Sequence, residues 1–351
     1  MKKIFILTII CLSSFQLYAS DYISVEIDGI LYNVDIDNNQ AYVITFEDKK
    51  YYGDIVIPSE ITFEGEKYSV TAIAKSTFSK CQYLTSVKIP NTIISIDMLA
   101  FYLSTELASI NLPEGITTIG NSAFEGCTGL TSVMIPNSLK ELGDAAFSGC
   151  SNITNVLIGS GLDMIGSFVF NDCSSLLDIS IPQNITYIGT SAFENCTSLI
   201  SLSIPNSVSQ LGTNAFFGCS ALSSIELPNS LTFIGNHAFE DCNGLTSVVS
   251  NIENPFKIIG SYGEKVFSQY TLENANLYVP AGTIDKYKAT DGWKEFRNII
   301  EADPSGVNKV VSIDNENNAV YDLNGIRRNH PQKGLNIIKM VDGTIRKVIN
   351  K

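Results

Sequence analysis

Positive charge is scarce in this sequence, above all in its middle. The 351 residues contain 36 Asp and Glu against 23 Lys and Arg, which gives a formal net charge of −13. Between Cys81 and Ser250 the only basic residues are Lys88 and Lys140, and 14 of the 23 lie beyond residue 250. A surface of this kind repels phosphate groups, so we expect neither nucleic acid nor an anionic membrane as a partner.

Histidine and paired cysteines, which carry much catalytic and metal chemistry, are equally rare. The only histidines are His237 and His330, and no C-x-x-C pair occurs. A thiol nucleophile needs a base beside it, and zinc needs ligands that converge. The segments that begin at Asp35 and Asp314 lack the glycine and the glutamate of an EF-hand loop, so we expect turns there. The sequence predicts no catalytic residue, no metal, no cofactor and no enzyme, although a pair of catalytic carboxylates has no sequence signature.

The sequence has one long hydrophobic run, near its N-terminus, and this run is too short to span a bilayer, which takes about 20 apolar residues. Residues 4–15 are apolar, follow two lysines and precede a short polar end, which is the layout of a secretory signal peptide. We expect residues 1–19 to be this signal, with cleavage after Ala19 or Ser20. The mature protein is then exported, and is either soluble or attached to a surface.

What the sequence does contain is one pattern that repeats every 23 residues. Phenylalanine keeps this step eight times, at Phe78, Phe101, Phe124, Phe147, Phe170, Phe193, Phe216 and Phe239. Cysteine follows three residues later, at Cys81, Cys127, Cys150, Cys173, Cys196, Cys219 and Cys242, and Ser104 fills the one missing place. Repeats of roughly 20–29 residues with apolar side chains at fixed positions are typical of leucine-rich solenoids, whose stacked coils share one core.

Each repeat predicts two short strands and a turn. In "SVMIP", residues 132–136, the alternation turns Val133 and Ile135 inward and leaves Ser132 and Met134 outward. "ITTIG" forms a second extended piece, and "NSAFEGC" is expected to be a short helical or 3-10 turn. The predicted fold class is a β-rich repeat solenoid of the leucine-rich type, with short helical or 3-10 turns.

The flanks of the repeat predict caps. The N-terminal flank alternates apolar and polar residues around "DG" and "NN" turns, which indicates β-hairpins. The C-terminal flank predicts a strand, a helix capped by Thr283, and Trp293 as a buried anchor. We predict an N-terminal β cap at 20–56, the solenoid at 57–250, a C-terminal cap at 251–303, a polar linker at 304–309 and a small β module at 310–351.

The unit A-F-x-x-C-x-x-L-x-S-V/I-x-I-P closely resembles the BspA-like leucine-rich repeat family, from Ile57 to Val248. It departs from the family pattern at Asp97, Ser104 and Gly159. The small C-terminal module resembles the sorting modules that pass bacterial proteins across an outer membrane by type IX secretion. The resemblance implies a cell-surface or secreted protein that adheres to host, matrix or neighbouring-cell proteins and that is not an enzyme.

The outward side chains of the "SVxIP" strands are the remaining candidate for a site. The predicted binding face consists of Ser132, Met134, Asn155, Leu157, Asp178, Ser180, Ser201, Ser203, Ser224 and Glu226. Met134 and Leu157 form an apolar spot among small neutral residues, and we expect a protein, or else a glycan, to dock on it. The alternatives are a glycan-binding protein that serves nutrient capture, a passive spacer and, least favoured, an enzyme. The outward columns contain no aromatic side chain, which counts against glycans, and we expect a monomer.

The seven cysteines beyond the predicted signal are expected to be buried, reduced thiols that fill space in the core. Stacked neighbours about 4.8 Å apart with parallel side chains do not meet the geometry of a disulfide, whose Cβ atoms turn toward each other.

Titration of the denatured mature protein with a thiol reagent should therefore find about seven reactive thiols. A single reactive thiol would mean three disulfides, and the prediction would then be wrong.

Overall fold

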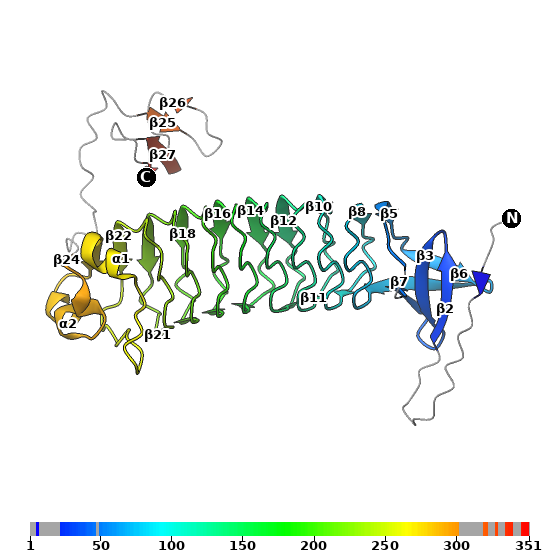
Figure 1. Ribbon diagram of the computed structural model, residues 1–351, viewed down its shortest axis with the longest axis horizontal. Helices are drawn as coiled ribbons and strands as arrows, with labels where there is room; N and C mark the ends of the chain where they lie inside the picture. The colour runs from blue at the N-terminus through cyan, green and yellow to red at the C-terminus, as the bar shows by residue number, and fades with distance from the viewer. Residues whose placement is uncertain are drawn as a thin grey trace. The chain divides into compact units, whose positions relative to one another are not determined.

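The computed structural model describes residues 5–6, 22–46, 49–301, 319–321, 327–328, 334–339 and 345–350. The chain divides into two compact units, residues 1–301 and residues 302–351. The first unit is an elongated stack of coils with a strand-rich cap at its N-terminal end and a small helical cap at its C-terminal end (Figure 1). The predicted signal peptide, apart from β1 (Phe5–Ile6), and the predicted linker lie outside the described residues.

Strands close the N-terminal end of the stack. They are β2 (Tyr22–Ile27), β3 (Ile30–Asp35), β4 (Gln40–Ile44), β6 (Glu60–Phe63) and β7 (Glu66–Ile73). The pairs β2–β3 and β3–β4 are antiparallel, as the predicted hairpins require, and β1–β2 and β6–β7 are antiparallel as well. Asp28 and Gly29 turn the chain between β2 and β3 at φ 50° and 85°, the left-handed geometry that makes Asp-Gly favourable in a two-residue hairpin loop. Strand β4 runs parallel to β7 and joins this cap to the first coil.

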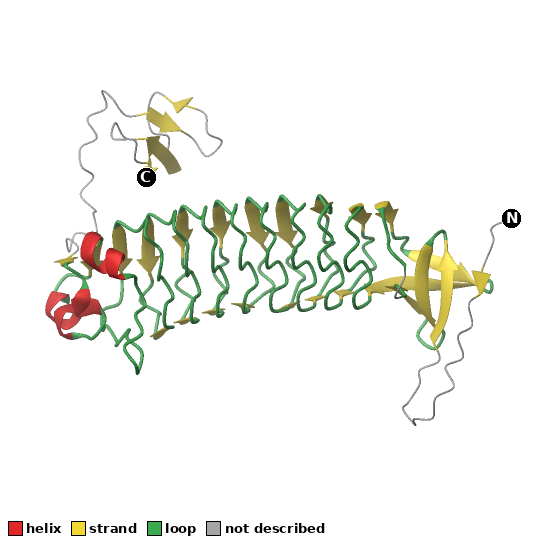
Figure 2. Ribbon diagram, in the orientation of Figure 1, coloured by secondary structure: helices red, strands yellow, loops and turns green. Residues whose placement is uncertain are grey.

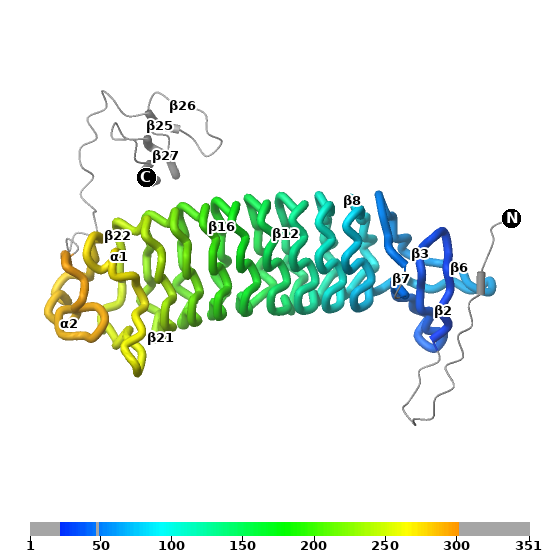
Figure 3. The backbone as a smooth tube through the Cα atoms, in the orientation of Figure 1, coloured from blue at the N-terminus to red at the C-terminus, as the bar shows by residue number. Residues whose placement is uncertain are grey.

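Two ladders of parallel strands run along the solenoid. The first ladder consists of two successive sheets. One contains β5 (Gly53–Val56), β8 (Leu84–Lys88) and β10 (Ser109–Ile110), and the other contains β12 (Ser132–Ile135), β14 (Asn155–Ile158), β16 (Asp178–Ser180), β18 (Ser201–Ser203), β20 (Ser224–Leu227), β22 (Ser247–Ser250), β23 (Asn276–Val279) and β24 (Asn298–Glu301). The second ladder contains β9 (Ser95–Ile96), β11 (Thr118–Ile119) and β13 (Glu141–Leu142), then β15 (Met164–Ile165), β17 (Tyr187–Ile188), β19 (Gln210–Leu211) and β21 (Phe233–Ile234). From β8 to β22 within the first ladder, paired residues such as Ser132 and Asn155 lie 23 positions apart, so each coil repeats the last (Figure 3). The predicted leucine-rich solenoid is confirmed.

The third side of each coil consists of turns: the i→i+3 bonds of the expected 3-10 turn occur singly, as from the amide of Glu125 to the carbonyl of Ser122, and no continuous helix forms (Figure 2). Two residues of every coil adopt left-handed backbone geometry, for example Ser122 at φ 53° and Gly126 at φ 70°. A 3-10 helix needs consecutive right-handed residues, and a left-handed residue every fourth position interrupts it. The freed backbone groups bond to the next coil instead, as when the amide of Phe124 donates to the carbonyl of Ala146 at 2.8 Å.

A column of phenylalanine rings forms the centre of the core. The eight rings of the repeat are fully buried and stacked, with neighbouring centroids 4.9–5.9 Å apart and planes within 18° of parallel. Phe267 continues the column beyond Phe239, at 5.3 Å, although the sequence pattern has ended there. The eight rings of the repeat recur every 23 residues, whereas Phe267 follows Phe239 after 28, so a longer coil can also return a ring to the stack.

The cysteine column lies beside the rings and is buried, with all seven as free thiols. From Cys127 onward each thiol donates to the carbonyl of a phenylalanine in the preceding coil, at 3.0–3.3 Å. Ser104 makes the same bond to the carbonyl of Phe78, at 2.6 Å, which explains why a hydroxyl can replace the thiol. Burial raises the pKa of the Cys127 and Cys173 thiols to about 12, so both stay protonated at neutral pH.

The C-terminal cap contains α1 (Gln269–Asn274), α2 (Ile284–Ala289) and the short 3-10 helix η1 (Trp293–Glu295). Trp293 is fully buried, packs on Phe267 and Tyr287, and donates its indole N–H to the carbonyl of Phe256 at 2.9 Å. The tryptophan therefore ends the aromatic column, as expected of an anchor. Thr283 does precede α2, but its hydroxyl donates to Pro280 instead of accepting from the helix, so the expected side-chain cap is wrong.

The second unit contains an antiparallel sheet. Its strands are β25 (Ala319–Tyr321), β26 (Arg327–Arg328), β27 (Gly334–Lys339) and β28 (Ile345–Asn350), in the order β26-β25-β27-β28. Among the described residues of the whole chain, no helix has the length and apolar character needed to cross a membrane.

Replacing one ring in the middle of the column tests the core. Phe170→Ala should lower the free energy of unfolding by about 3–5 kcal/mol, because a buried aromatic ring leaves a cavity. Phe233→Ala, at a half-exposed ring on the surface, should cost less than about 1 kcal/mol. Denaturant unfolding followed by circular dichroism measures both. Equal losses would show that the stacked column has no special role.

Candidate functional site

The ten residues predicted as a binding face lie together on one side of the solenoid. The strand register places them in two columns: Ser132, Asn155, Asp178, Ser201 and Ser224 in one, and Met134, Leu157, Ser180, Ser203 and Glu226 in the other. All are exposed except Ser201, which is half-buried. The alternate residues of the same strands are buried in the core. We call the outward side of β12, β14, β16, β18 and β20 the outer face.

The outer face carries an apolar patch at its N-terminal half. Met134 and Leu157 are direct neighbours in the register, and their exposed fractions are 61% and 52%. Large apolar side chains exposed to this degree, side by side on a rigid sheet, are the usual mark of an interaction surface.

Two further residues, which the sequence analysis missed, lie just before the strands. Leu177 and Ile200 are exposed by 48% and 50%, and they are neighbours because the amide of Ile200 donates to the carbonyl of Leu177. Other coils place threonine, serine or alanine at this position. The sequence did carry a signal for them: two successive coils place leucine and isoleucine where the other coils place small or hydroxyl side chains. Met134 and Leu157 form one apolar pair, and Leu177 and Ile200 form another, three positions earlier along the strands; the four side chains are together called the apolar patch below.

The rest of the outer face is polar and weakly acidic. Asp178 and Glu226 are its only charged residues among the ten. The Glu226 carboxylate accepts a hydrogen bond from the side chain of Asn251 at 2.8 Å. Toward the N-terminus, on β5, Asp54 accepts from the hydroxyls of Ser86 and Thr85 at 2.6 and 2.8 Å. These two bonds lower the pKa of the Asp54 carboxyl.

Aromatic side chains are exposed elsewhere on the solenoid, which the two predicted columns did not reveal. Phe233 and the half-buried Tyr187 lie on the second ladder, in one register column with Met164. Tyr52 and Tyr83 are about three-quarters exposed at the first coil, where the amide of Gly53 donates to the carbonyl of Tyr83.

The side chains considered above for metal binding or acid-base chemistry lie apart from one another or outside the described residues. Among the residues that the structure describes, no group of three or more His, Cys, Asp and Glu side chains could hold a metal ion. Asp35 closes the turn between β3 and β4, where its carboxylate accepts from the backbone and side chain of Asn38, and these bonds lower its pKa. His237 occupies a left-handed turn position and contacts Glu240. Asp314 and His330 lie outside the described residues.

Comparison with protein families finds one match. A family model described as the BspA-type leucine-rich repeat region matches residues 71–200 and 163–288, with six copies of the repeat. No curated protein matches the chain.

Solved structures of bacterial leucine-rich proteins are similar to this chain. A leucine-rich cell surface protein from Faecalibacterium prausnitzii is 22% identical, with 80% of this chain and 95% of that chain covered and a TM-score of 0.46. A leucine-rich repeat protein from Bacteroides ovatus is also 22% identical, with 79% and 90% covered and a TM-score of 0.41.

Proposed function

Since the chain belongs to the BspA-type leucine-rich repeat family, we propose that it is an exported cell-surface protein that binds another macromolecule through the outer face. Adhesion to a host, matrix or neighbouring-cell protein is the form of binding that the surface supports best. The signal-like N-terminus and the sorting-like C-terminal module support export.

The apolar patch is the observation that carries this proposal. Among the described residues, no buried side-chain nitrogen or oxygen lacks a hydrogen-bond partner. The four side chains of the patch lie outside the core, since each is exposed by about half or more. A passive spacer would need only small polar residues at these positions, as most other coils have. Burying the patch against a partner would remove its apolar area from water, which is favourable.

A protein partner fits the outer face because the face is flat, largely neutral and repeated. Interface cores are poor in charge and rich in methionine and other large apolar side chains, with a polar rim around them. Here the apolar patch is the centre, and the hydroxyls of Ser180, Ser203 and Ser224 form part of the rim.

A surface glycan-binding protein is the second candidate. The observation that favours it is the exposure of Tyr52 and Tyr83 at neighbouring positions of the first coil. Aromatic side chains with one apolar face and a polar tip suit amphipathic ligands. Such a site would lie at the N-terminal end of the first ladder, away from the apolar patch.

Two double variants test whether the outer face is the binding site. Once a screen of the mature protein against matrix proteins and glycans has found a ligand, Met134→Asp with Leu157→Asp should weaken its binding by about tenfold or more. The stability should change by less than about 1 kcal/mol, because both side chains are exposed. Surface plasmon resonance and denaturant unfolding provide the two measurements.

The matched control is Met164→Asp with Phe233→Asp, which adds the same charge to apolar residues of similar exposure on the second ladder. This control should bind like the unmodified protein. If instead the control loses binding and the first variant does not, the outer face is not the site.

A further inference from the structure

The first ladder ends in an open edge. Strand β24 pairs in parallel with β23 along Asn298–Glu301. In the part of the chain that the structure describes, no strand pairs with its other side. Such an edge presents backbone N–H and C=O groups in the spacing of a strand, and an extended segment of another chain can pair with it.

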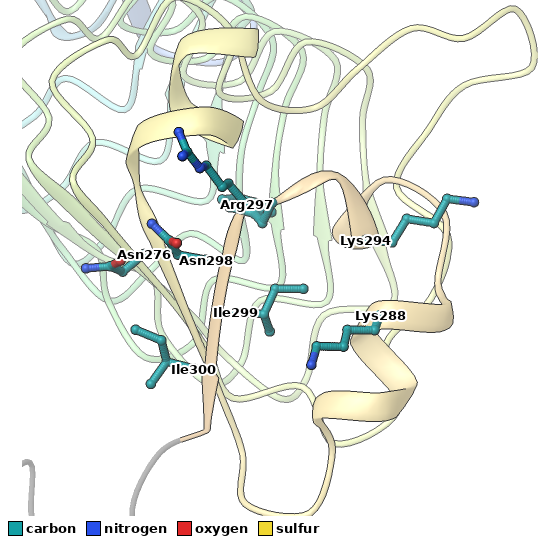
Figure 4. A pocket seen from close by; sticks show the side chains of 8 residues that line it. Asn276, Lys288, Lys294, Arg297, Asn298, Ile299 and Ile300 are labelled. Atoms are coloured by element: carbon teal, nitrogen blue, oxygen red, sulfur yellow. The ribbon is translucent and has the colours of Figure 1, made fainter.

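A pocket lies against this edge. Its volume is about 570 Å³, and residues of β24 and of the segment just before it form one wall. Lys288, from α2, points toward Ile299 of β24, while Arg297 and Asn298 stand at the start of the strand (Figure 4). Ile300, which is 40% exposed, adds an apolar contact at the same edge.

The lining of the pocket is positively charged, in contrast to the coils of the solenoid. It contains Lys288, Lys294 and Arg297 and no acidic residue. Lys294 is neutralised by Asp291, at 2.6 Å. For the exposed Lys288 and Arg297 no ion pair with another described residue is present. Two unpaired cations in a chain of net charge −13 attract an acidic partner to this end, while the acidic coils repel it.

We propose that the β24 edge and this pocket bind an acidic peptide segment in extended conformation. The peptide adds one strand to the ladder through main-chain hydrogen bonds, and its carboxylates pair with Lys288 and Arg297. The planar guanidinium of arginine can bind a carboxylate through two parallel hydrogen bonds, which favours an acidic side chain beside the start of β24. This site is separate from the outer face and does not depend on the function proposed for it.

The partner is a peptide because the open strand edge and the two cations lie at the same place, and a peptide can contact both. A membrane surface or a polyanion could satisfy the cations, but neither offers alternating backbone donors and acceptors to the strand edge. Conversely, a neutral strand would leave both cations without partners.

Fluorescence anisotropy with the full chain tests the proposal. The probe is a labelled octapeptide in which valine and glutamate alternate, and it should bind with an affinity that falls as salt rises. Lys288→Glu with Arg297→Glu should weaken binding by about tenfold or more, because charge-assisted hydrogen bonds are lost. Lys140→Glu with Lys88→Glu, which changes the charge by the same amount on exposed residues of the coils, should leave the affinity within about twofold.

A second peptide of the same charge, with proline in place of valine, separates pairing from simple attraction. Proline lacks the N–H that a strand must donate, so this peptide should bind about tenfold more weakly. Equal binding of the two peptides would overturn the proposal. So would concentration-dependent self-association of the chain that the Lys288 and Arg297 variant abolishes, because the occupant would then be a second copy.

We expect peptide binding at the β24 edge to be independent of ligand binding at the outer face. The variant with Met134→Asp and Leu157→Asp should bind the peptide normally, even if it has lost its surface ligand. Loss of peptide binding in that variant would show that the peptide docks on the outer face and that the edge is not the site.

Discussion

The stacking of one phenylalanine ring on the next is the constraint on which the rest of the structure depends. Neighbouring rings lie 4.9–5.9 Å apart, close to the spacing of strands in a sheet, so ring stacking and backbone pairing advance together. The turns provide this match because two left-handed residues in each coil bring the chain back to the same place. The cysteines then link the turn to the coil before it through bonds to phenylalanine carbonyls. Strand, turn and core thus share one period.

This shared period also determines what the surface can be. Since every coil repeats the same inward positions, large changes of side-chain chemistry are concentrated at the outward ones, where a substitution costs little stability. Leucine, isoleucine and methionine at outward positions of successive coils accumulate into a patch without disturbing the stack. The ends of the stack differ from its sides, since a ladder must either be covered there or leave a strand edge. The N-terminal end is covered by a meander, and the C-terminal end places β24 next to two lysines and an arginine.

Much of this could be predicted from the sequence, because a repeated pattern gives many independent observations of one local structure. The period and the inward and outward residues of strands such as β12 followed from it, while the C-terminal flank, beyond the repeat, predicted Trp293 as a buried anchor. The turn conformation did not, since left-handed backbone at Ser122 or Ala145 has no signature without glycine. The hydrogen bond that makes Ser104 equivalent to cysteine could not be predicted from the sequence, because its acceptor is a backbone carbonyl in another coil. Leu177 and Ile200 escaped notice since they precede the strand and fall outside its alternation, and the pocket at β24 arises from the packing of α2 in a non-repeating cap.

Deleting coils tests the central claim that an unbroken 23-residue period holds the protein together. Removing residues 163–185, which is one whole period, joins Leu162 to Thr186 and restores the repeat. Denaturant unfolding of this variant should remain a cooperative transition, with a smaller dependence on denaturant in proportion to the surface removed. Removing residues 163–184 instead leaves one extra residue in this coil, so Leu162 and Ile185 compete for the same buried position, and the variant should unfold at a lower denaturant concentration than the first. Equal stability of the two variants, or loss of folding in both, would contradict the account.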